Sequence, residues 1–472
     1  MLKYILLATA LGTVTANATE LPRRIFGESE SERAARLAWW QEGRFGMFIH
    51  FGLYALPARG EWVKSKEQIP EAEYDRYFAQ FDPDLFDART WVRTAKAAGM
   101  QYVVLTVKHH EGFCLWDTAT TDYKITKTPF CRDLVREFAD ACHAEGMGLG
   151  FYYSIIDWHH PDFTVDATHP RRPFADSRDV NDANRAEYAA KVRAINANRD
   201  MAKYRAYMFA QVKEILSGYG KVDIVWFDYV DKGLFHKTWR DYDSVELLKL
   251  ARRLQPGIIV DSRLDLMETE DGWDFVTPEQ FKPQSAPTVR GRKVPWETCQ
   301  TFSGSWGYAR DEATWKDLPQ LIELLADVVS KDGNLILNVG PTARGVFDAR
   351  AMERLEGFGR WMNLHSRAIR GCGAAPEGFA KPDGTLLTCN RRTNRLYVHL
   401  VDWPMGFLPV AFLDRIAYAQ FLHDGSELKL RTPPKRHGQD GEQLHELGGI
   451  VLPMRRPAGV EVPVIEIFLK GE

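Results

Sequence analysis

Residues 44–370 alternate short apolar runs with longer amphipathic stretches, a pattern typical of strands and helices that alternate around a parallel sheet. The short runs are rich in β-branched and aromatic residues and predict strands at residues 45–51, 102–107, 147–153, 222–227, 257–260, 296–302 and 334–339. The amphipathic stretches predict helices at residues 87–98, 132–145, 201–217, 245–253 and 314–330. The run 222–227 is apolar at nearly every position, as expected for a strand covered on both faces.

Seven or eight such units favour an α/β fold with a (β/α)8-like, TIM-type barrel over an open, doubly wound sheet. A nucleotide-binding open sheet carries a glycine-rich phosphate turn after a strand, and neither GxGxxG nor GxxxxGK[ST] follows any predicted strand. Residues 159–200 are a polar insertion after the third predicted strand. We expect them to form a long loop on the face of the barrel that carries the active site, or a surface excursion without function.

After about Gly371 the pattern changes to short alternating segments separated by Gly, Pro and Asp. These segments lie at residues 385–389, 395–401, 415–421, 427–430 and 460–468. Short alternating strands with such turns indicate an antiparallel β-sandwich of roughly a hundred residues. We therefore assign residues 19–370 to a catalytic barrel domain and residues 371–472 to a C-terminal β-sandwich domain.

Residues 1–18 have the features of a secretory signal peptide. Lys3 supplies a positive charge, residues 4–11 are nearly all apolar, and Ala16-Asn17-Ala18 fits the small-residue cleavage pattern. An uncleaved membrane anchor is the alternative, but the apolar run is shorter than the ~20 residues that a membrane-spanning helix needs. We expect an exported, periplasmic or extracellular protein without a membrane span.

The charge and cysteine content exclude several classes of function. The 472 residues include 61 Lys and Arg against 64 Asp and Glu, a formal net charge of -3, which argues against nucleic acid as a partner. The cysteines lack CxxC spacing, which removes the structural zinc and thioredoxin interpretations. Pairing of Cys372 with Cys389 and buried free thiols both stay open for an exported chain.

Barrel enzymes place catalytic groups at the carboxyl ends of their strands, so polar residues that end the apolar runs are candidates. These residues are His50, His109, His110, Asp157, Asp228, Asp261, Arg263 and Glu297. Asp228 is the strongest, because residues 222–227 lead a buried strand directly into its carboxylate; a helix N-cap or a salt-bridged strand end is the alternative. Asp261 ranks second, since Arg263 offers it an ion-pair partner.

His109 and His110 stand next to each other after the second predicted strand. Adjacent histidines on a strand point to opposite faces and HExxH spacing is absent, so we expect no shared metal and no other cofactor. Neutral imidazoles suit hydrogen bonding to a polyhydroxylated ligand, whereas a satisfied core histidine is the alternative for one of the two. A metal-dependent hydrolase is the weaker hypothesis, and chelation would test it.

Aromatic residues crowd the same strand ends, namely Trp62, Trp116, Tyr152, Tyr153, Trp158, Trp226, Trp306 and Tyr308. With the carboxylates and histidines they predict a sugar pocket, in which rings stack on C–H faces and polar groups bind hydroxyls. Glycoside hydrolysis needs two carboxyl groups, one to protonate the leaving oxygen and one that is ionised. Asp228 is a natural ionised member, and Glu61, Glu111, Glu279 and Glu297 are all available as its partner.

Motifs along the barrel resemble those of the α-L-fucosidases of glycoside hydrolase family 29. They are residues 44–52, Gly60-Glu61-Trp62, Lys108-His109-His110-Glu111-Gly112-Phe113, Trp226-Phe227-Asp228, Pro295-Trp296-Glu297-Thr298, Ser305-Trp306-Gly307-Tyr308 and residues 333–341. The resemblance implies a retaining exo-glycosidase that releases terminal α-L-fucose from fucosylated glycans. It also implies a barrel domain followed by a β-sandwich. A carbohydrate-binding protein without chemistry is the alternative, which the paired carboxylates disfavour.

The resemblance also assigns roles to residues. The family's aspartate nucleophile matches Asp228, and residues 274–279 resemble the segment of its glutamate acid/base, which nominates Glu279, with Glu297 as second choice. The family's sugar-binding positions carry over to His50, Glu61, Trp62, His109, His110, Tyr152, Arg263 and Trp306. The chain departs from the family at Tyr229, where glycine is frequent, and we expect this change to alter the rim of the pocket.

Overall fold

The computed structural model describes residues 20–174, 179–228, 235–432, 436–437, 443–444 and 448–471. The predicted signal peptide at residues 1–18 and the departure at Tyr229 both lie outside these described residues. Across the described part of the chain, no helix is long and apolar enough to cross a membrane.

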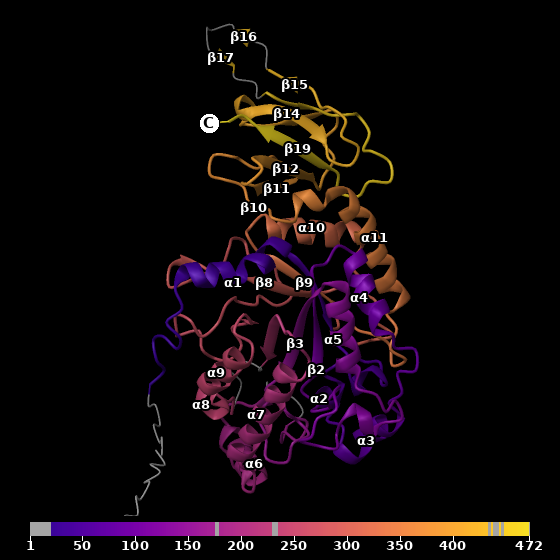
Figure 1. Cartoon of the computed structure of the whole chain (residues 1–472), viewed down its shortest axis with the longest axis vertical. Coiled ribbons are helices and arrows are strands. Elements are labelled where there is room, and N and C mark those ends of the chain that lie inside the picture. Colours follow the sequence, from indigo (N-terminus) through magenta and orange to yellow (C-terminus); the bar gives the residue numbers. More distant parts are fainter. Residues whose placement is uncertain are drawn as a thin grey trace, which may run out of the picture.

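Seven parallel strands form a curled sheet in the order β5-β4-β3-β2-β1-β9-β8 (Figure 1). They are β1 (Phe45–Ile49), β2 (Tyr102–Lys108), β3 (Gly148–Ser154), β4 (Ile224–Asp228), β5 (Ile259–Val260), β8 (Glu297–Thr301) and β9 (Asn334–Val339). Nearly every residue of these strands is buried, because the sheet is covered on both faces. The barrel prediction is therefore confirmed, with each strand inside or close to its predicted range.

The gap between β5 and β8 is filled by residues 274–279, which run parallel to both strands through isolated bridges. The amide of Asp274 donates to the carbonyl of Val260 over 2.8 Å, and the amide of Glu297 donates to the carbonyl of Val276 over 3.0 Å. This segment takes the eighth position around the barrel. It matters for function because Glu279 lies at its end.

Helices cover the outside of the sheet (Figure 1). The five predicted helices are present as α4 (Ala88–Ala97), α5 (Leu134–Glu145), α7 (Met201–Ser217), α9 (Ser244–Leu254) and α10 (Leu318–Val329), whereas the analysis missed α11 (Ala349–His365). Local signals fix their ends. In α5 the carboxylate of Asp133 accepts a hydrogen bond from the amide of Arg136, and Gly146 ends the helix in the left-handed conformation at φ 66°.

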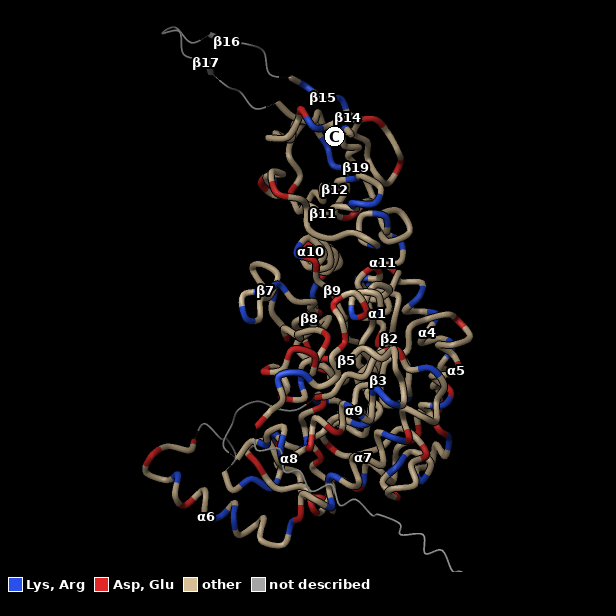
Figure 2. Tube along the Cα trace, turned by 60° about the vertical axis from the view of Figure 1, so that its left-hand side comes forward, with Lys and Arg blue, Asp and Glu red and all other residues tan. Residues whose placement is uncertain are grey.

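Further short elements decorate the barrel. They are α1 (Glu30–Gly43), α2 (Val63–Lys66), α3 (Glu71–Gln80), α6 (Arg185–Asn196), α8 (Trp239–Tyr242), the 3-10 turns η1 (Leu53–Ala55) and η2 (Ile125–Lys127), and the hairpin β6 (Thr288–Val289) with β7 (Arg292–Lys293). Helix α6 lies within residues 159–200, so that insertion is not wholly a loop. It stands at the end of the molecule opposite the C-terminal sheets (Figures 1 and 2).

The C-terminal residues form antiparallel sheets, as predicted. One sheet has the order β10-β11-β12-β19-β14 and a second has the order β13-β18-β15. Their strands are β10 (Gly373–Ala374), β11 (Thr385–Asn390), β12 (Arg395–Leu400), β13 (Phe407–Pro409), β14 (Ile416–Phe421), β15 (Leu430–Arg431), β18 (Gly449–Val451) and β19 (Val464–Leu469), with η5 (Leu413–Arg415) and the hairpin β16 (Arg436–His437) and β17 (Gln443–Leu444) beside them. One buried cluster joins residues of both sheets, including Val398 and Ile450, which is the core expected of a sandwich.

The C-terminal sheets pack against α10 and α11 of the barrel, where η4 (Ser366–Ala368) follows α11 (Figure 1). The indole of Trp361 donates to the carbonyl of Val462 over 3.2 Å, and both side chains belong to the main core cluster. All six cysteines are free thiols, so Cys372 and Cys389 do not form a disulfide. Positive and negative residues are interspersed along the trace (Figure 2).

Candidate active site

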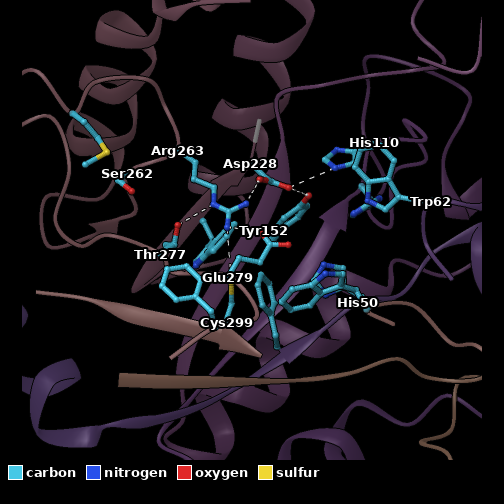
Figure 3. A pocket seen from close by; sticks show the side chains of 16 residues that line it. His50, Trp62, His110, Tyr152, Asp228, Ser262, Arg263, Thr277, Glu279 and Cys299 are labelled. Carbon is cyan, nitrogen blue, oxygen red and sulfur yellow. Dashed lines mark hydrogen bonds and ion pairs between the residues drawn. The ribbon is translucent and has the colours of Figure 1, made fainter. Parts of the chain in front are cut away.

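A cavity of about 660 Å³ lies at the carboxyl ends of the barrel strands (Figure 3). Its lining includes most of the residues predicted from the sequence, namely Asp228, Glu279, His50, Trp62, His109, His110, Tyr152, Arg263 and Trp306. Its volume lies within the usual range of ligand pockets, about 300–1,000 Å³. The cavity combines aromatic walls with two carboxylates, which is the composition predicted for a sugar pocket.

Asp228 is the last residue of β4, and its carboxylate projects into the cavity with a side chain that is only 12% exposed. The hydroxyl of Tyr152 on the neighbouring β3 donates to Oδ2 over 2.7 Å, and Nη1 of Arg263 donates to Oδ1 over 2.8 Å. Both carboxylate oxygens are thus held by donors. The geometry fixes the carboxylate in one orientation.

Arg263 links the two carboxylates of the cavity. Its Nη2 donates to Oε2 of Glu279 over 2.6 Å, while its Nε donates to the hydroxyl of Thr277 over 2.9 Å (Figure 3). The guanidinium also lies over the Trp226 ring, 4.5 Å from the centroid. Burial alone lowers the pKa of Arg263, but the charges of Asp228 and Glu279 outweigh it and hold that pKa above its ordinary value.

Glu279 differs from Asp228 in its exposure. Its side chain is 41% exposed, against 12% for Asp228, so the cavity opens on the Glu279 side. Its backbone pairs with Cys299 of β8, which lines the same cavity. Asp228 therefore lies on the closed side of the cavity and Glu279 on its open side.

Hydrogen bonds assign the tautomers of two cavity histidines. Nδ1 of His50 lies 2.6 Å from Oδ1 of Asn338, which only accepts, so Nδ1 carries the proton and Nε2 is left as an acceptor. Nδ1 of His110 lies 2.7 Å from the hydroxyl of Ser154, which itself donates to the carbonyl of Ile156, so Nε2 of His110 is likewise an acceptor. Burial lowers the pKa of each of these histidines to about 3, which keeps both neutral.

The expectation that His109 and His110 point to opposite faces is wrong. Strand β2 ends at Lys108, so the two histidines follow the strand and both line the cavity, with ring centroids 4.1 Å apart. Burial lowers the pKa of His109, and its Nδ1 has no hydrogen-bond partner in the described structure. A buried polar atom without a partner inside a cavity is suited to a ligand hydroxyl.

Glu61 is not among the residues that line the cavity. Its Oε2 accepts hydrogen bonds from the amides of Trp306 and Gly307, over 3.2 and 2.8 Å. Asn338 donates to the carbonyl of Trp306 over 2.6 Å, so Trp306 is held from two sides. Glu61 therefore contacts the backbone that carries Trp306.

Glu297, the second choice for the acid/base, begins β8 instead of ending it and does not line the cavity. Its side chain is fully buried. Oε2 of Glu297 accepts hydrogen bonds from Nε1 of Trp40, over 3.2 Å, and from the hydroxyl of Tyr102. Glu111 is also buried outside the cavity lining, where it accepts from the amide of Leu53 over 3.1 Å. These two glutamates are therefore part of the packed structure.

Two other strand-end candidates also have structural partners. Asp261 is buried and accepts from the amides of Phe227 and Arg263, over 2.9 and 3.1 Å, so it orients the backbone beside Asp228. The predicted ion pair between Asp261 and Arg263 is replaced by the bonds from Arg263 to the cavity carboxylates. Asp157 forms a buried ion pair with Lys108 at 3.0 Å.

Several lining residues were not singled out from the sequence. They are Phe48, Ser262, Met267, Thr277, Phe281 and Cys299. Thr277 belongs to the irregular segment that closes the barrel and Phe281 follows that segment, and no strand pattern marks which side chains face inward there. Phe48 has an inward position on β1 that alternation along the strand would have indicated.

One group within the described residues has the spacing of metal ligands, namely Glu71, Asp75 and His159. Lys64 already places its ammonium 2.9 Å from Oε1 of Glu71. None of these residues lines the cavity, and neither His109 nor His110 belongs to the group.

Comparison with known proteins gives consistent results. A model of the α-L-fucosidase family matches residues 14–367. The solved α-L-fucosidase isoenzyme 1 from Paenibacillus thiaminolyticus is 39% identical, with a TM-score of 0.81 over 93% of this chain and 100% of that one. A family 29 α-L-fucosidase from Bacteroides thetaiotaomicron, trapped as a covalent intermediate with 2-fluoro-fucosyl fluoride, is 25% identical, with a TM-score of 0.76 over 96% and 100%. Tissue α-L-fucosidase of Rattus norvegicus is 28% identical over 78% of this chain and 76% of its own.

Proposed function

Since this chain belongs to the α-L-fucosidase family of glycoside hydrolases, we propose that Asp228 is its nucleophile and Glu279 its general acid and base. The enzyme is a retaining α-L-fucosidase, which releases terminal α-L-fucose from fucosylated glycans by double displacement. One guanidinium supports the assignment of roles: Arg263 bonds both carboxylates at 2.8 and 2.6 Å. Such proximity favours the short carboxyl separation of retaining enzymes, about 5–5.5 Å, over the wider one of inverting enzymes.

In the first step, the Asp228 carboxylate attacks the anomeric carbon and the fucosyl–oxygen bond breaks. Glu279 protonates the departing oxygen, and Arg263 stabilises the carboxylate that Glu279 becomes. The bonds from Tyr152 and Arg263 hold Asp228 in a single orientation before attack. Because the nucleophile is already oriented, the reaction does not pay the entropy of ordering it in the transition state.

In the second step, Glu279 takes a proton from water, and the resulting attack on the anomeric carbon releases Asp228. Glu279 suits this exchange because its side chain is 41% exposed, so water and leaving group both reach it. Asp228 is shielded at 12%, which protects the covalent fucosyl-enzyme from water on the other face. The anomeric configuration is retained because two inversions occur.

Fucose recognition rests on the neutral histidines. Nε2 of His50 and Nε2 of His110 are acceptors, so each takes a hydrogen bond from a sugar hydroxyl. His109 offers an unpartnered ring nitrogen, and the rings of Trp62 and Trp306 supply apolar walls for C–H groups and the C6 methyl. Glu61 contributes by holding Trp306 in place.

The decisive assay compares an aryl α-L-fucoside with other aryl glycosides, and wild type with Asp228→Asn. We expect fucoside-selective turnover that falls at least 10³-fold in the variant, because the carboxamide is no nucleophile. Proton NMR of the first product formed should show the α anomer. A folded wild type without fucosidase activity, an active Asp228→Asn, or a β anomer as first product would each contradict the proposal.

Export is the remaining part of the functional assignment. Residues 1–18 carry a positive charge, an apolar run and a small-residue cleavage pattern, which supports a periplasmic or extracellular enzyme. Mass spectrometry of the mature chain tests this, since cleavage after Ala18 predicts an N-terminus at Thr19.

A further inference from the structure

Two large apolar side chains of the cavity lining are exposed. Met267 is 39% exposed and Phe281 is 58% exposed, although both line the same cavity as Asp228 and Glu279. Apolar side chains in the lining of a ligand cavity supply most of its contact with the ligand. The question is which part of the substrate reaches them.

The reaction places the leaving group beside the acid. Glu279 protonates the glycosidic oxygen, so whatever is bonded to that oxygen lies on the side of Glu279 that faces away from the fucose. That side is the open one, as the exposures of Glu279 and Asp228 indicate. Phe281 follows Glu279 by two residues, just after the segment that closes the barrel, so its ring borders the leaving group.

The backbone holds Phe281 in this exposed position. The carbonyl of Phe281 accepts from the hydroxyl of Thr298 over 3.1 Å and from Nε2 of Gln300 over 3.3 Å. Gln280 before it donates its amide to the carbonyl of Cys299 over 3.0 Å and adopts a left-handed φ of 58°. A strained backbone that is tied to a barrel strand indicates a position maintained for function.

Met267 is also placed by its surroundings. It lies in a turn where the amide of Thr269 donates to the carbonyl of Leu266 over 2.9 Å. Asp265, at a left-handed φ of 58°, accepts from the amide of Trp239 over 2.9 Å. The Met267 side chain is flexible and polarisable, which suits contact with differently shaped groups.

The polar groups nearby define the chemistry of the ligand. Ser262 also lines the cavity and contributes a hydroxyl to it. The charged residues of the lining, Asp228, Arg263 and Glu279, are already paired with one another. Among the described residues of the lining, no charged side chain is therefore left unpaired for an ionic group, and the rim offers apolar contact with one hydroxyl.

We propose that Met267 and Phe281 form the leaving-group subsite, and that it takes a neutral pyranose whose C–H face lies on the Phe281 ring. Ser262 hydrogen-bonds a hydroxyl of that sugar. This inference rests on the proposed function, since Glu279 as acid defines where the leaving group lies. The subsite also binds sugar acceptors after the first step: the acceptor oxygen bonds the anomeric carbon, its proton passes to Glu279, and the bond to Asp228 breaks.

Three substrates separate the subsite from the fucose site. α-L-Fucosyl fluoride has a leaving group too small to reach Met267 or Phe281, an aryl fucoside reaches them in part, and a fucosyl disaccharide with a neutral pyranose reaches them fully. We expect Met267→Ala/Phe281→Ala to lower kcat/KM on the disaccharide about tenfold or more, chiefly through KM, and to leave the fluoride within about twofold. Met405→Ala, at an exposed methionine of the C-terminal part, is the matched control.

A second measurement uses transfer. Aryl fucoside with added neutral pyranose acceptor should give a fucosylated acceptor in wild type and at least fivefold less of it, relative to hydrolysis, in the double variant. Equal losses on all three substrates, or no loss on any, would overturn the subsite while leaving the proposed function intact. A wild type inactive on the fluoride and on the disaccharide would overturn both.

Discussion

The hydroxyl of Tyr152 donates to Oδ2 of Asp228 over 2.7 Å, from one barrel strand to the next. The register of β3 and β4 places Ser154 opposite Asp228, so Tyr152 reaches the carboxylate from two residues earlier on its strand. The next residue, Tyr153, points away from the cavity and bonds Gln211 over 2.7 Å. Of two adjacent tyrosines on one strand, Tyr152 thus contacts the cavity carboxylate and Tyr153 belongs to the core.

Replacing each tyrosine with phenylalanine separates these roles. We expect Tyr152→Phe to lower kcat/KM on an aryl fucoside about 10- to 100-fold, because a hydrogen bond to a charged group contributes about 1.5–3 kcal/mol. Tyr153→Phe should keep the activity of the folded enzyme but lose about 1–3 kcal/mol of unfolding free energy, since Lys108 and Gln211 lose a partner. Steady-state kinetics and urea unfolding of both variants are the test. Equal activity losses would contradict the division.

Arg263 gives a second prediction, because its planar guanidinium bonds Asp228, Glu279 and Thr277 at once. Lysine keeps the charge but lacks the fork, so Arg263→Lys should lose at least tenfold in kcat on an aryl fucoside. Thr277→Val removes only the contact to Nε and should lose less. If Arg263→Lys were as active as wild type, the guanidinium would not be needed to join the two carboxylates.

The barrel was predictable from the sequence because its strands are buried on both faces, and runs such as residues 222–227 show this directly. Asp228 was singled out by the same signal, because a buried strand leads directly into its carboxylate. Helix α11 was missed because charged residues and two glycines, Gly357 and Gly359, interrupt its apolar positions, although Trp361 and Phe358 are buried.

Other parts of the site depend on where strands begin and end. Lys108 ends β2, which lets His109 and His110 face one cavity, and Glu297 begins β8, which buries it away from the cavity. A shift of one or two residues in a boundary reverses such assignments. Glu279 and Phe281 lie on a segment without strand periodicity, so only the resemblance to a family pointed to the first and nothing pointed to the second.

The pair Glu279 and Glu297 provides a third prediction, through Glu→Gln at each position. Glu279→Gln should lose at least 10²-fold in kcat/KM on a disaccharide, which needs protonation of its leaving oxygen, and much less in kcat/KM on fucosyl fluoride, which does not. On the fluoride kcat should still fall, because Glu279 is also the base of the second step. Glu297→Gln should retain wild-type kcat, because Glu297 does not line the cavity. A reversed result would make Glu297 the acid.

Glu297→Gln should also change the pH dependence of stability. Burial raises the pKa of Glu297 to about 7 from an ordinary 4.5. The folded state thus holds a proton that the unfolded state releases between these values, and stability falls as pH rises through this window by roughly 1.4 kcal/mol per unit. Glutamine does not titrate, so Glu297→Gln should not show this fall in unfolding free energy. Urea unfolding of both proteins at pH 5 and pH 8 should show the variant gaining relative to wild type at pH 8.

Buried neutral histidines predict the opposite slope on the acid side. Burial lowers the pKa of His399 to about 3, and Nε2 of this histidine lies 2.9 Å from the Thr388 hydroxyl, far from the cavity. Between pH 6.5 and about 3 the unfolded state binds a proton that the folded state does not, so stability falls as pH falls. His399→Gln should reduce the loss of unfolding free energy between pH 7 and pH 5, with activity unchanged. An unaltered loss would mean that His399 protonates without unfolding.

Lys108 and Asp157 form a buried ion pair, and neither residue lines the cavity. The two side chains are almost fully buried, 3.0 Å apart, and Lys108 also donates to the Tyr153 hydroxyl and lies over its ring. Lys108→Met removes one charge and leaves the Asp157 carboxylate buried without it, which should cost about 3–5 kcal/mol of unfolding free energy. Asp157 still accepts from the amides of His159 and His160, so its carboxylate keeps two donors.

The double variant Lys108→Met/Asp157→Asn separates two causes of the lost stability. One is the loss of the attraction between the two charges, and the other is the burial of an Asp157 carboxylate without its partner. Asparagine keeps an oxygen for the two amides and carries no charge, so the double variant should regain at least half of the stability lost in Lys108→Met. Urea unfolding of the two single variants and the double variant gives the coupling energy directly. If the losses simply added, the buried charge would not be the source of the instability, and the contact between Lys108 and Tyr153 would have to account for it.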